Sequence, residues 1–509
     1  GLRGSGKLGW SLGEANSKIF SFGANSAVAD TMQIRINVLE VDDRLGLETS
    51  NVNGLLDYDE GIGHFEANDE SVITTLPYNQ YTTSMNKFDW DMKGSTITFE
   101  SDKDNPALFT SIHPDQDSLQ FRGEEATYDL KSSLLAIEGV EYIVSSDAFI
   151  YPDSQYIEIS ADAEMAKLEN AQIIADTTSK YHVINRATVE IKGRRVYEAS
   201  GFYEYNVGPH EQEFELDNII GQPIGKGSYK DKRSVTRATG EIQPTDTFYI
   251  DHKTQFRGTI SLDAEEKSLN FNGYARFNAE NLPNKYWFTV SFAGDKNDLV
   301  IDYDVPSSYE NDPLFSGLFL SKEFSRVYPR IITPLYFRKD RRILDLSTGV
   351  IKYLEDKDQF ILGDSAIVLG NEIVGNKMLF KNVDGSVEAE GKFTLGSELR
   401  YMQVDAAGRA STAFPPPAPE EEIPEEEETG GIMLAEDPLV TEEPEETVPF
   451  DPSQIAFTAE WMMGLKMRIP ENLLKIVQND FESASFESRA IGYLTDISFF
   501  FSFVFQYDC

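Results

Sequence analysis

Residues 121–160 read FRGEEATYDLKSSLLAIEGVEYIVSSDAFIYPDSQYIEIS, and they carry the pattern that dominates the whole chain. Apolar and polar residues alternate in short runs, which end at turns rich in Gly, Asn and Asp. A period of two matches a strand with one buried face, and Tyr, Phe, Ile, Val and Thr suit a pleated surface. Further runs are Thr96–Glu100, Thr188–Lys192 and Ser386–Glu390. The sequence therefore predicts an all-β fold.

Two segments also share an order of residues. They begin at Phe121–Gly123 and Phe256–Gly258, and each continues as strand, polar turn, strand and Gly corner. The spacing from an aspartate to the closing glycine is the same in both copies, Asp129 to Gly139 and Asp263 to Gly273. We expect stacked antiparallel β-repeats, in which each repeat buries its apolar face against the next. A β-meander of short strands produces similar echoes and remains the alternative.

The composition excludes several classes of protein. Among 509 residues, 86 Asp and Glu face 45 Lys and Arg, and the net charge is −41. This acid excess argues against nucleic acid as a partner and against docking on anionic lipid heads. The single cysteine, Cys509, excludes a disulfide or a Cys-based zinc site within the chain. Such low cysteine usage fits a bacterial envelope or surface protein built on β-structure.

The chain divides into regions of different composition. Residues 413–453 are rich in Pro and Glu and predict a stiff, extended, disordered linker. After it, Pro470–Phe481 has the only helical periodicity, with an apolar stripe behind a proline in the first turn. The predicted regions are a β-repeat region 1–206, a second β-region 207–305, a third β-region 306–412, the linker 413–453 and an incomplete α+β tail 454–509.

The ends of the chain and its apolar stretches add two further expectations. The sequence starts at Gly1 without a signal-peptide pattern, and we expect a piece of a longer polypeptide. No apolar stretch reaches the roughly 18–20 residues that a membrane helix needs. The sequence therefore predicts no transmembrane helix.

Catalytic motifs are weak. The five histidines are not spaced as paired metal ligands along the chain, so a metal centre would need residues that converge from a distance. They are His64, His113, His182, His210 and His252. Without a paired histidine, the usual serine and cysteine nucleophiles lack their base. We therefore predict that the protein is not an enzyme.

One acidic turn is a candidate calcium site. Asp57, Asp59 and Glu60 precede Gly61 and offer carboxylate oxygens beside a glycine turn. The segment departs from the EF-hand pattern, which needs a third ligand before the Gly and a Glu six residues after it. A plain hairpin turn between two strands is the alternative interpretation.

The segment from Ala126–Lys131 through Leu135–Val140 to Ala148–Pro152 resembles the OstA-like repeats of lipopolysaccharide-transport proteins in Gram-negative envelopes. The likeness centres on residues 121–205. It implies a β-jellyroll or β-taco, or a related solenoid-like sheet, around an apolar groove. We expect the inward side chains of this unit to line a groove or a closed core, and they are Leu135, Ile137, Tyr142 and Val144. The chain is longer and more acidic than a lone transport module, so it looks like a section of a large envelope protein.

Three functions remain open at this stage. The first is a non-enzymatic structural or binding module of the bacterial cell envelope, in the periplasm, at the outer membrane or on the cell surface. Its partners would be other envelope proteins or lipid, and an exposed edge strand could pair with another chain. The second is a lipid or lipopolysaccharide conduit. The third is a glycan-binding or carbohydrate-active β-sandwich. A filled interior favours the first, an open apolar groove the second, and two convergent carboxylates with a surface Trp the third.

Overall fold

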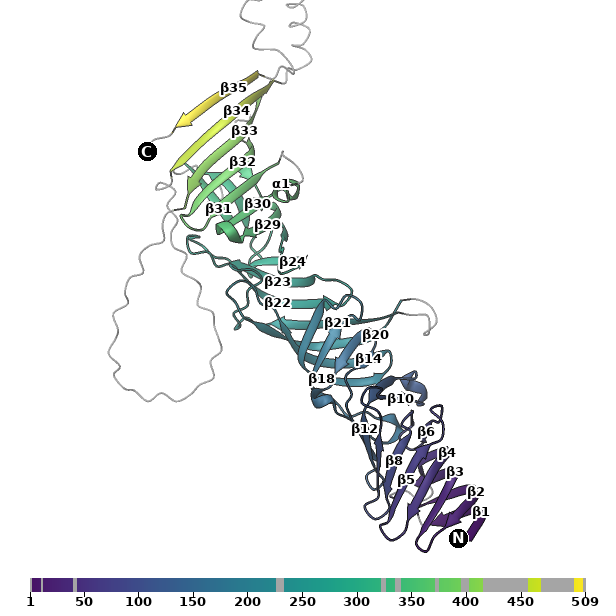
Figure 1. The fold of residues 1–509 in the computed structure, drawn as a ribbon. Helices are drawn as coiled ribbons and strands as arrows, with labels where there is room; N and C mark the ends of the chain where they lie inside the picture. Colours follow the sequence, from purple (N-terminus) through teal and green to yellow (C-terminus); the bar gives the residue numbers. More distant parts are fainter. Residues whose placement is uncertain are drawn as a thin grey trace, which may run out of the picture. The chain divides into compact units, whose positions relative to one another are not determined.

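The predicted all-β fold of stacked antiparallel strands is confirmed by a computed structural model (Figure 1). The structure describes residues 2–10, 12–39, 44–225, 233–321, 326–334, 340–370, 375–394, 402–414, 456–467 and 499–506. Most of the predicted linker 413–453 and the predicted helix Pro470–Phe481 lie outside these residues. Within them, no helix is both long enough and apolar enough to span a membrane.

The chain forms two compact units. Unit 1 comprises Gly1–Asn206, Glu211–Ile242 and Thr259–Leu269, and unit 2 comprises Val207–His210, Gln243–Gly258 and Asn270–Cys509. The predicted β-repeat region 1–206 therefore belongs to unit 1, whereas residues of the predicted region 207–305 are shared between the two units.

Unit 1 contains both long and short strands. The long strands at its start are β1 (Leu2–Trp10), β2 (Gly13–Phe22), β3 (Ser26–Asn37) and β4 (Leu45–Asp57). The short strands are β5 (Ile62–Ala67), β6 (Thr74–Leu76), β7 (Tyr81–Thr83), β8 (Lys87–Asp91), β9 (Thr96–Glu100), β10 (Ala107–Ser111), β11 (Gln120–Gly123), β12 (Glu125–Asp129), β13 (Leu134–Glu138), β14 (Ile143–Ser145), β15 (Ala148–Tyr151) and β16 (Ile157–Ile159). Long strands follow again, namely β17 (Leu168–Ala175), β18 (His182–Gly193), β19 (Val196–Glu204), β20 (Glu213–Ile224) and β21 (Arg233–Ile242). Single turns of 3₁₀-helix lie at η1 (Pro114–Gln116), η2 (Asp153–Gln155) and η3 (Ala161–Ala163).

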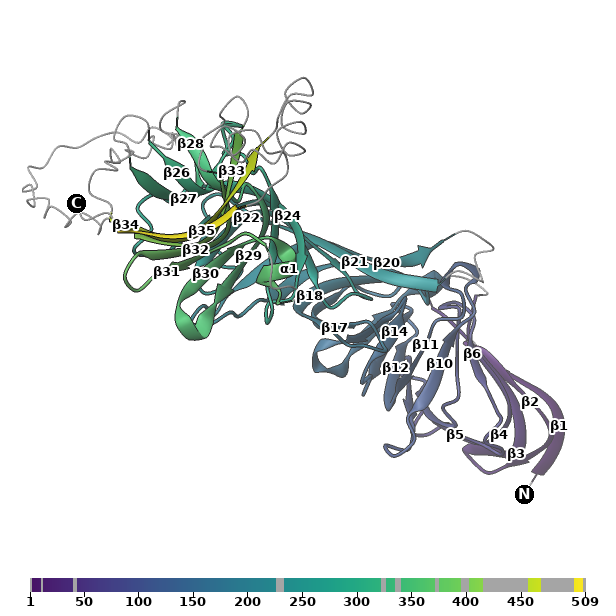
Figure 2. The same ribbon diagram turned by 90° about the horizontal axis from the view of Figure 1, so that it is seen from above.

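The short strands alternate between two layers of one continuous 24-stranded sheet, which we call wall A and wall B (Figure 2). Wall A has the strand order β5-β8-β9-β12-β13-β16. Wall B has the order β6-β7-β10-β11-β14-β15, and β17 and β18 extend it. After most hairpins the chain therefore crosses to the other wall. This alternation is a jellyroll built from stacked repeats, in which each wall buries one face against the other.

Buried amides tie the two walls together. Asn79, in the turn between β6 and β7 of wall B, donates through Nδ2 to the carbonyls of Ser133 at 2.9 Å and Ile159 at 3.1 Å in wall A. Gln116, between β10 and β11, donates through Nε2 to the carbonyl of Ala163 at 2.6 Å. These bonds satisfy backbone carbonyls of wall A and of the turn that follows it from side chains of wall B, and they link the two walls through the interior.

The long strands bend so that one strand serves both walls. Within β4, Val52–Asp57 pair with β5 of wall A, whereas Glu48 pairs with β6 of wall B. The bend falls at Asn51, which has a φ of 60° and interrupts the register with β3. Similar breaks occur at Asn170 and Arg186, with φ of 54° and 48°, where β17 meets β18. These are β-bulges, which bend a strand without ending it.

Unit 2 is built on a second antiparallel sheet with the order β25-β29-β30-β31-β32-β33-β34-β35 and a separate small sheet β27-β26-β28. The strands of unit 2 are β24 (Phe288–Gly294), which belongs to neither of these two sheets, and β25 (Ile301–Asp304), β26 (Phe315–Leu320), β27 (Val327–Thr333), β28 (Arg341–Asp345), β29 (Thr348–Leu354), β30 (Gln359–Gly363), β31 (Lys377–Lys381), β32 (Ser386–Thr394), β33 (Met402–Ala413), β34 (Phe457–Met467) and β35 (Phe499–Gln506). Two strands, β22 (Thr254–Asp263) and β23 (Leu269–Phe277), have residues in both units. Short helical turns occur at η5 (Glu355–Lys357) and α1 (Ser365–Val368).

An aromatic ladder forms the core of unit 2. Ring centroids of Phe277 and Phe360 are 4.8 Å apart, those of Phe360 and Phe380 are 6.3 Å apart, and those of Phe380 and Phe414 are 5.8 Å apart. Strand β34, which follows the predicted linker, pairs with β33. The first strand of the predicted tail 454–509 is thus part of the sheet of unit 2.

The glycines of the sequence echo differ between the two copies, because Gly258 and Gly273 lie inside β22 and β23 and not at the predicted corner, whereas Gly139 directly follows β13. Gly258 has a φ of 130°, and a Cβ there would lie 2.6 Å from the carbonyl oxygen of Asn272. A Cβ on Gly273 would lie 2.1 Å from the carbonyl oxygen of Arg257. In the first copy Gly139, with a φ of 70°, begins the crossing from β13 of wall A to β14 of wall B. The repeated glycines are therefore at positions where a neighbouring backbone comes close or where the chain adopts a positive φ.

The substitution Gly258→Ala tests this requirement. A side chain at this φ is strained and meets a backbone oxygen that cannot move aside, so we expect a loss of roughly 1–3 kcal/mol. Gly9→Ala is the control, because an added Cβ at Gly9 meets nothing within 4 Å. Urea unfolding of both variants is the measurement, and an unchanged midpoint for Gly258→Ala would contradict the account.

Candidate functional site

The predicted groove begins with two residues of β13, Leu135 and Ile137. Both are 0 % exposed. Leu135 lies between Tyr128 of β12 and Ile159 of β16, and Ile137 lies beside Ile157 in the same wall. No water-accessible space touches these side chains, so they belong to a filled interior rather than to an open groove.

The other two predicted groove residues point the opposite way. Tyr142 is 39 % exposed and Val144 is 37 % exposed, so the prediction that they face inward was wrong. Ile143 faces inward instead, because its backbone pairs with Phe121 of β11 and Ile150 of β15. Because residues 142–144 are all apolar, the sequence does not show which of them is buried. The register with distant strands determines which side chain faces inward.

These outward residues belong to a larger apolar surface on wall B. Tyr142 contacts Phe149 edge-on, with ring centroids 5.1 Å apart and planes at 88°, and Tyr151 at 5.8 Å. The ammonium group of Lys180 lies 5.2 Å from the centroid of the Phe149 ring. This surface was not predicted from the sequence. The sequence feature that indicates it is a local loss of apolar–polar alternation, which leaves consecutive apolar residues in four strands, namely Tyr142–Val144, Phe149–Tyr151, Ile173–Ile174 and Val183–Ile184.

The candidate calcium residues build a hairpin turn between β4 and β5. The Oδ1 atom of Asp57 accepts hydrogen bonds from the amides of Asp59 at 3.0 Å and Glu60 at 3.1 Å. Asp59 accepts a 2.6 Å bond from the side chain of Asn25. Among the residues that the structure describes, no group of three or more His, Cys, Asp or Glu could hold a metal ion. Asp57, Asp59 and Glu60 are thus not brought together as ligands.

The histidines do not gather into one site, and only His210 and His252 are in contact among the hydrogen bonds of the described residues, through the His210 Nε2 atom and the His252 carbonyl at 3.2 Å. His64 lies on the surface beside Asp89 at 2.8 Å, and His210 stacks on Tyr249 with centroids 3.7 Å apart. His182 is fully buried at the start of β18 and bonds to the hydroxyl of Tyr203 at 3.1 Å and to the carbonyl of Glu266 at 2.7 Å. Burial lowers the pKa of His182, although the Glu266 carbonyl and nearby Asp176 and Asp263 oppose the shift.

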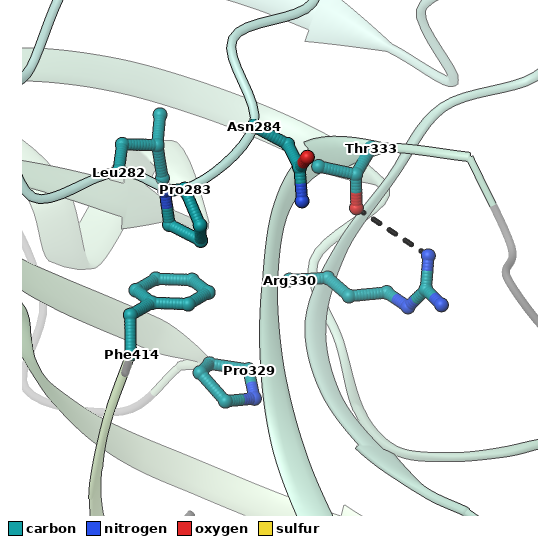
Figure 3. A pocket seen from close by; sticks show the side chains of 7 residues that line it. All are labelled: Leu282, Pro283, Asn284, Pro329, Arg330, Thr333 and Phe414. Atoms are coloured by element: carbon teal, nitrogen blue, oxygen red, sulfur yellow. Dashed lines mark hydrogen bonds between the residues drawn. The ribbon is translucent and has the colours of Figure 1, made fainter. Parts of the chain in front are cut away.

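A small cavity in unit 2 is lined by seven residues and measures about 10 Å³ (Figure 3). They are Leu282, Pro283, Asn284, Pro329, Arg330, Thr333 and Phe414. Arg330 is almost fully buried, donates to the hydroxyl of Tyr328 at 3.1 Å and lies 5.2 Å from the centroid of the Phe319 ring. A space of this size holds at most one water molecule, so the cavity is a packing feature rather than a ligand site.

A wider depression of about 750 Å³ lies where β1 to β4 bend. Its lining includes Asn16, Lys18, Asp30, Gln33 and Asn51, with amide and hydroxyl groups in the majority. It contains a single carboxylate, that of Asp30, and no Trp. The pair of carboxylates and the surface Trp expected of a glycan-processing site are therefore not found in this depression.

Comparisons with known proteins add no assignment. No family model, curated protein or solved structure matches this chain. The described residues of unit 1 have a filled interior and an exposed apolar surface on wall B.

The buried His182 predicts a pH dependence. The unfolded chain takes up a proton near pH 6.5, whereas the folded chain resists it, so stability falls as pH drops below about 6.5. His182→Gln removes this part of the dependence. The measurement is the urea midpoint of the full chain at pH 7.5 and 5.5, with His64→Gln as the surface control. Equal pH dependence in the wild type and in His182→Gln would contradict the prediction.

Proposed function

We propose that this chain is a non-enzymatic structural module of the bacterial cell envelope, which spans distance by stacking β-repeats. The observation that supports this proposal is the filled interior of unit 1. Side chains of wall A, such as Phe99 and Ile137, and of wall B, such as Phe109 and Ile143, are all 0 % exposed. A packed core of this kind stabilises each repeat against its neighbours and resists bending, which is what a spacer or scaffold requires.

The lipid conduit fits the structure less well. A conduit needs apolar surface that a lipid chain can reach from solvent, and an acyl chain needs a continuous channel. The zero exposure of Leu135 and Ile137 weighs against such a channel in the segment that resembles OstA-like repeats. The experiment below distinguishes the two functions by detecting bound lipid or lipopolysaccharide.

Location and assembly belong to the same proposal. A chain with one cysteine and a net charge of −41 suits the periplasm, the outer-membrane surface or the cell exterior, where β-structure replaces disulfides in holding the fold. Strand β1 is mostly exposed along its length. Pairing of this edge with a strand of another envelope protein would extend the scaffold.

The test is lipid analysis of the full chain. The protein is purified without detergent from a Gram-negative host, and lipid extracted from it is quantified by mass spectrometry. A scaffold with a filled core is expected to carry no lipid in proportion to protein. About one lipid or lipopolysaccharide molecule per chain would overturn the proposal in favour of the conduit.

A matched pair of variants separates the interior from the surface. Ile137→Asp places a charge inside the packed core, and we expect it to cost more than about 3 kcal/mol of stability. Thr127→Asp, on the outer face of the neighbouring strand β12, is expected to cost less than about 1 kcal/mol. A conduit predicts a different pattern, in which Ile137→Asp stays folded and loses bound lipid while Thr127→Asp keeps it.

A further inference from the structure

Four apolar residues form a continuous row across four adjacent strands of wall B and its extension. Val144 of β14 is opposite Phe149 of β15, Phe149 is opposite Ile174 of β17, and Ile174 is opposite Val183 of β18. Val144 and Val183 are 37 % and 38 % exposed, and the other two are half-buried. We call these residues the apolar row. Tyr142 and Tyr151 lie directly beside it.

The apolar row differs from the outward residues of the short strands of wall A. The corresponding outward row of wall A runs through Asp89, Thr98, Thr127, Ala136 and Glu158, which is almost entirely polar. An antiparallel sheet with one solvent-exposed face normally carries polar residues on that face, as wall A does. Exposing the apolar row to water is unfavourable, and such surfaces mark sites of association.

The charges at the two ends of the apolar row have opposite sign. At one end, β11 carries the exposed Arg122, which lies beside Tyr142 in the register that pairs Phe121 with Ile143. At the other end, Glu204 of β19 lies beside Val183, and Glu213 of β20, which forms an ion pair with Arg186, is opposite Glu204. Asn185 donates to Glu204 at 3.3 Å, and both carboxylates remain exposed.

We propose that two copies of this chain pack face to face through their apolar rows. A two-fold axis parallel to the strands, lying between the two sheets, reverses the direction of one row relative to the other. The Arg122 end of each copy then meets the Glu204 end of its partner, so the pattern is self-complementary. The sheets would stack at the usual spacing, with Phe149 and Ile174 of both copies at the centre of the interface and Tyr142 near its Arg122 end.

A second copy fits this surface better than other occupants. A uniformly charged partner would be attracted at one end of the row and repelled at the other, whereas a reversed copy satisfies both ends. The interface does not depend on the scaffold role, because it uses the outer face of wall B and leaves the interior untouched.

The test is sedimentation of the full chain over a wide range of protein concentration. We expect a reversible monomer–dimer equilibrium. Phe149→Ser is expected to weaken dimerisation at least about tenfold, which corresponds to about 1.4 kcal/mol. Leu55→Ser, at an exposed apolar residue of β4 outside the row, is the control and is expected to leave the dimer unchanged. Circular dichroism and thermal unfolding establish that each variant is folded.

Charge reversal tests the orientation of the two copies. Arg122→Glu alone is expected to weaken the dimer, and adding Glu204→Arg to the same chain is expected to restore much of the affinity, because the two positions then meet with exchanged signs. A monomer at all concentrations, a Phe149→Ser variant that dimerises as tightly as the wild type, or a monomer that binds lipid vesicles through this face would each overturn the proposal.

Discussion

The structure of unit 1 depends on one constraint, which is that each short strand has an apolar inner face that only the opposite wall can cover. Phe99 in wall A and Phe109 in wall B are both fully buried, and burial of such a side chain contributes about 1.5–3 kcal/mol. Neither wall is stable alone, because its apolar face would be exposed to water. The crossings of the chain between walls, the Gly corners and the buried amides of Asn79 and Gln116 all follow from the need to keep the two faces together.

The same constraint explains why the interior and the outer faces differ in character. Interior positions are mainly aliphatic or aromatic, and wall B also buries the small hydroxyl side chains of Thr74, Thr83, Ser111 and Ser145. Outer positions are free to serve other purposes. Wall A uses them for polar residues, whereas wall B carries the apolar row, and the acids near Asp57 shape a hairpin turn. Function in a protein of this kind therefore belongs to the outer faces and strand edges.

Much of the fold could be predicted from the sequence, because alternation is a local signal. Thr96–Glu100 and Ser386–Glu390 are strands where the pattern places them, whereas the predicted glycine corner is found at Gly139 and not at Gly273, which lies inside β23. The division into two walls could not be predicted, since it depends on which distant strands pair. Tyr142 and Val144 show the limit most directly. With apolar residues at three successive positions, only pairing of Ile143 with Phe121 and Ile150 determines which side chain is buried.

The central claim is that walls A and B form one packed body in which each protects the other. Hydrogen–deuterium exchange of the full chain tests it directly, by comparing peptides that cover β12 and β13 of wall A with peptides that cover β11 and β14 of wall B. The account predicts that both sets exchange slowly and lose protection together as denaturant is added. Fast exchange in one wall while the other stays protected would contradict it.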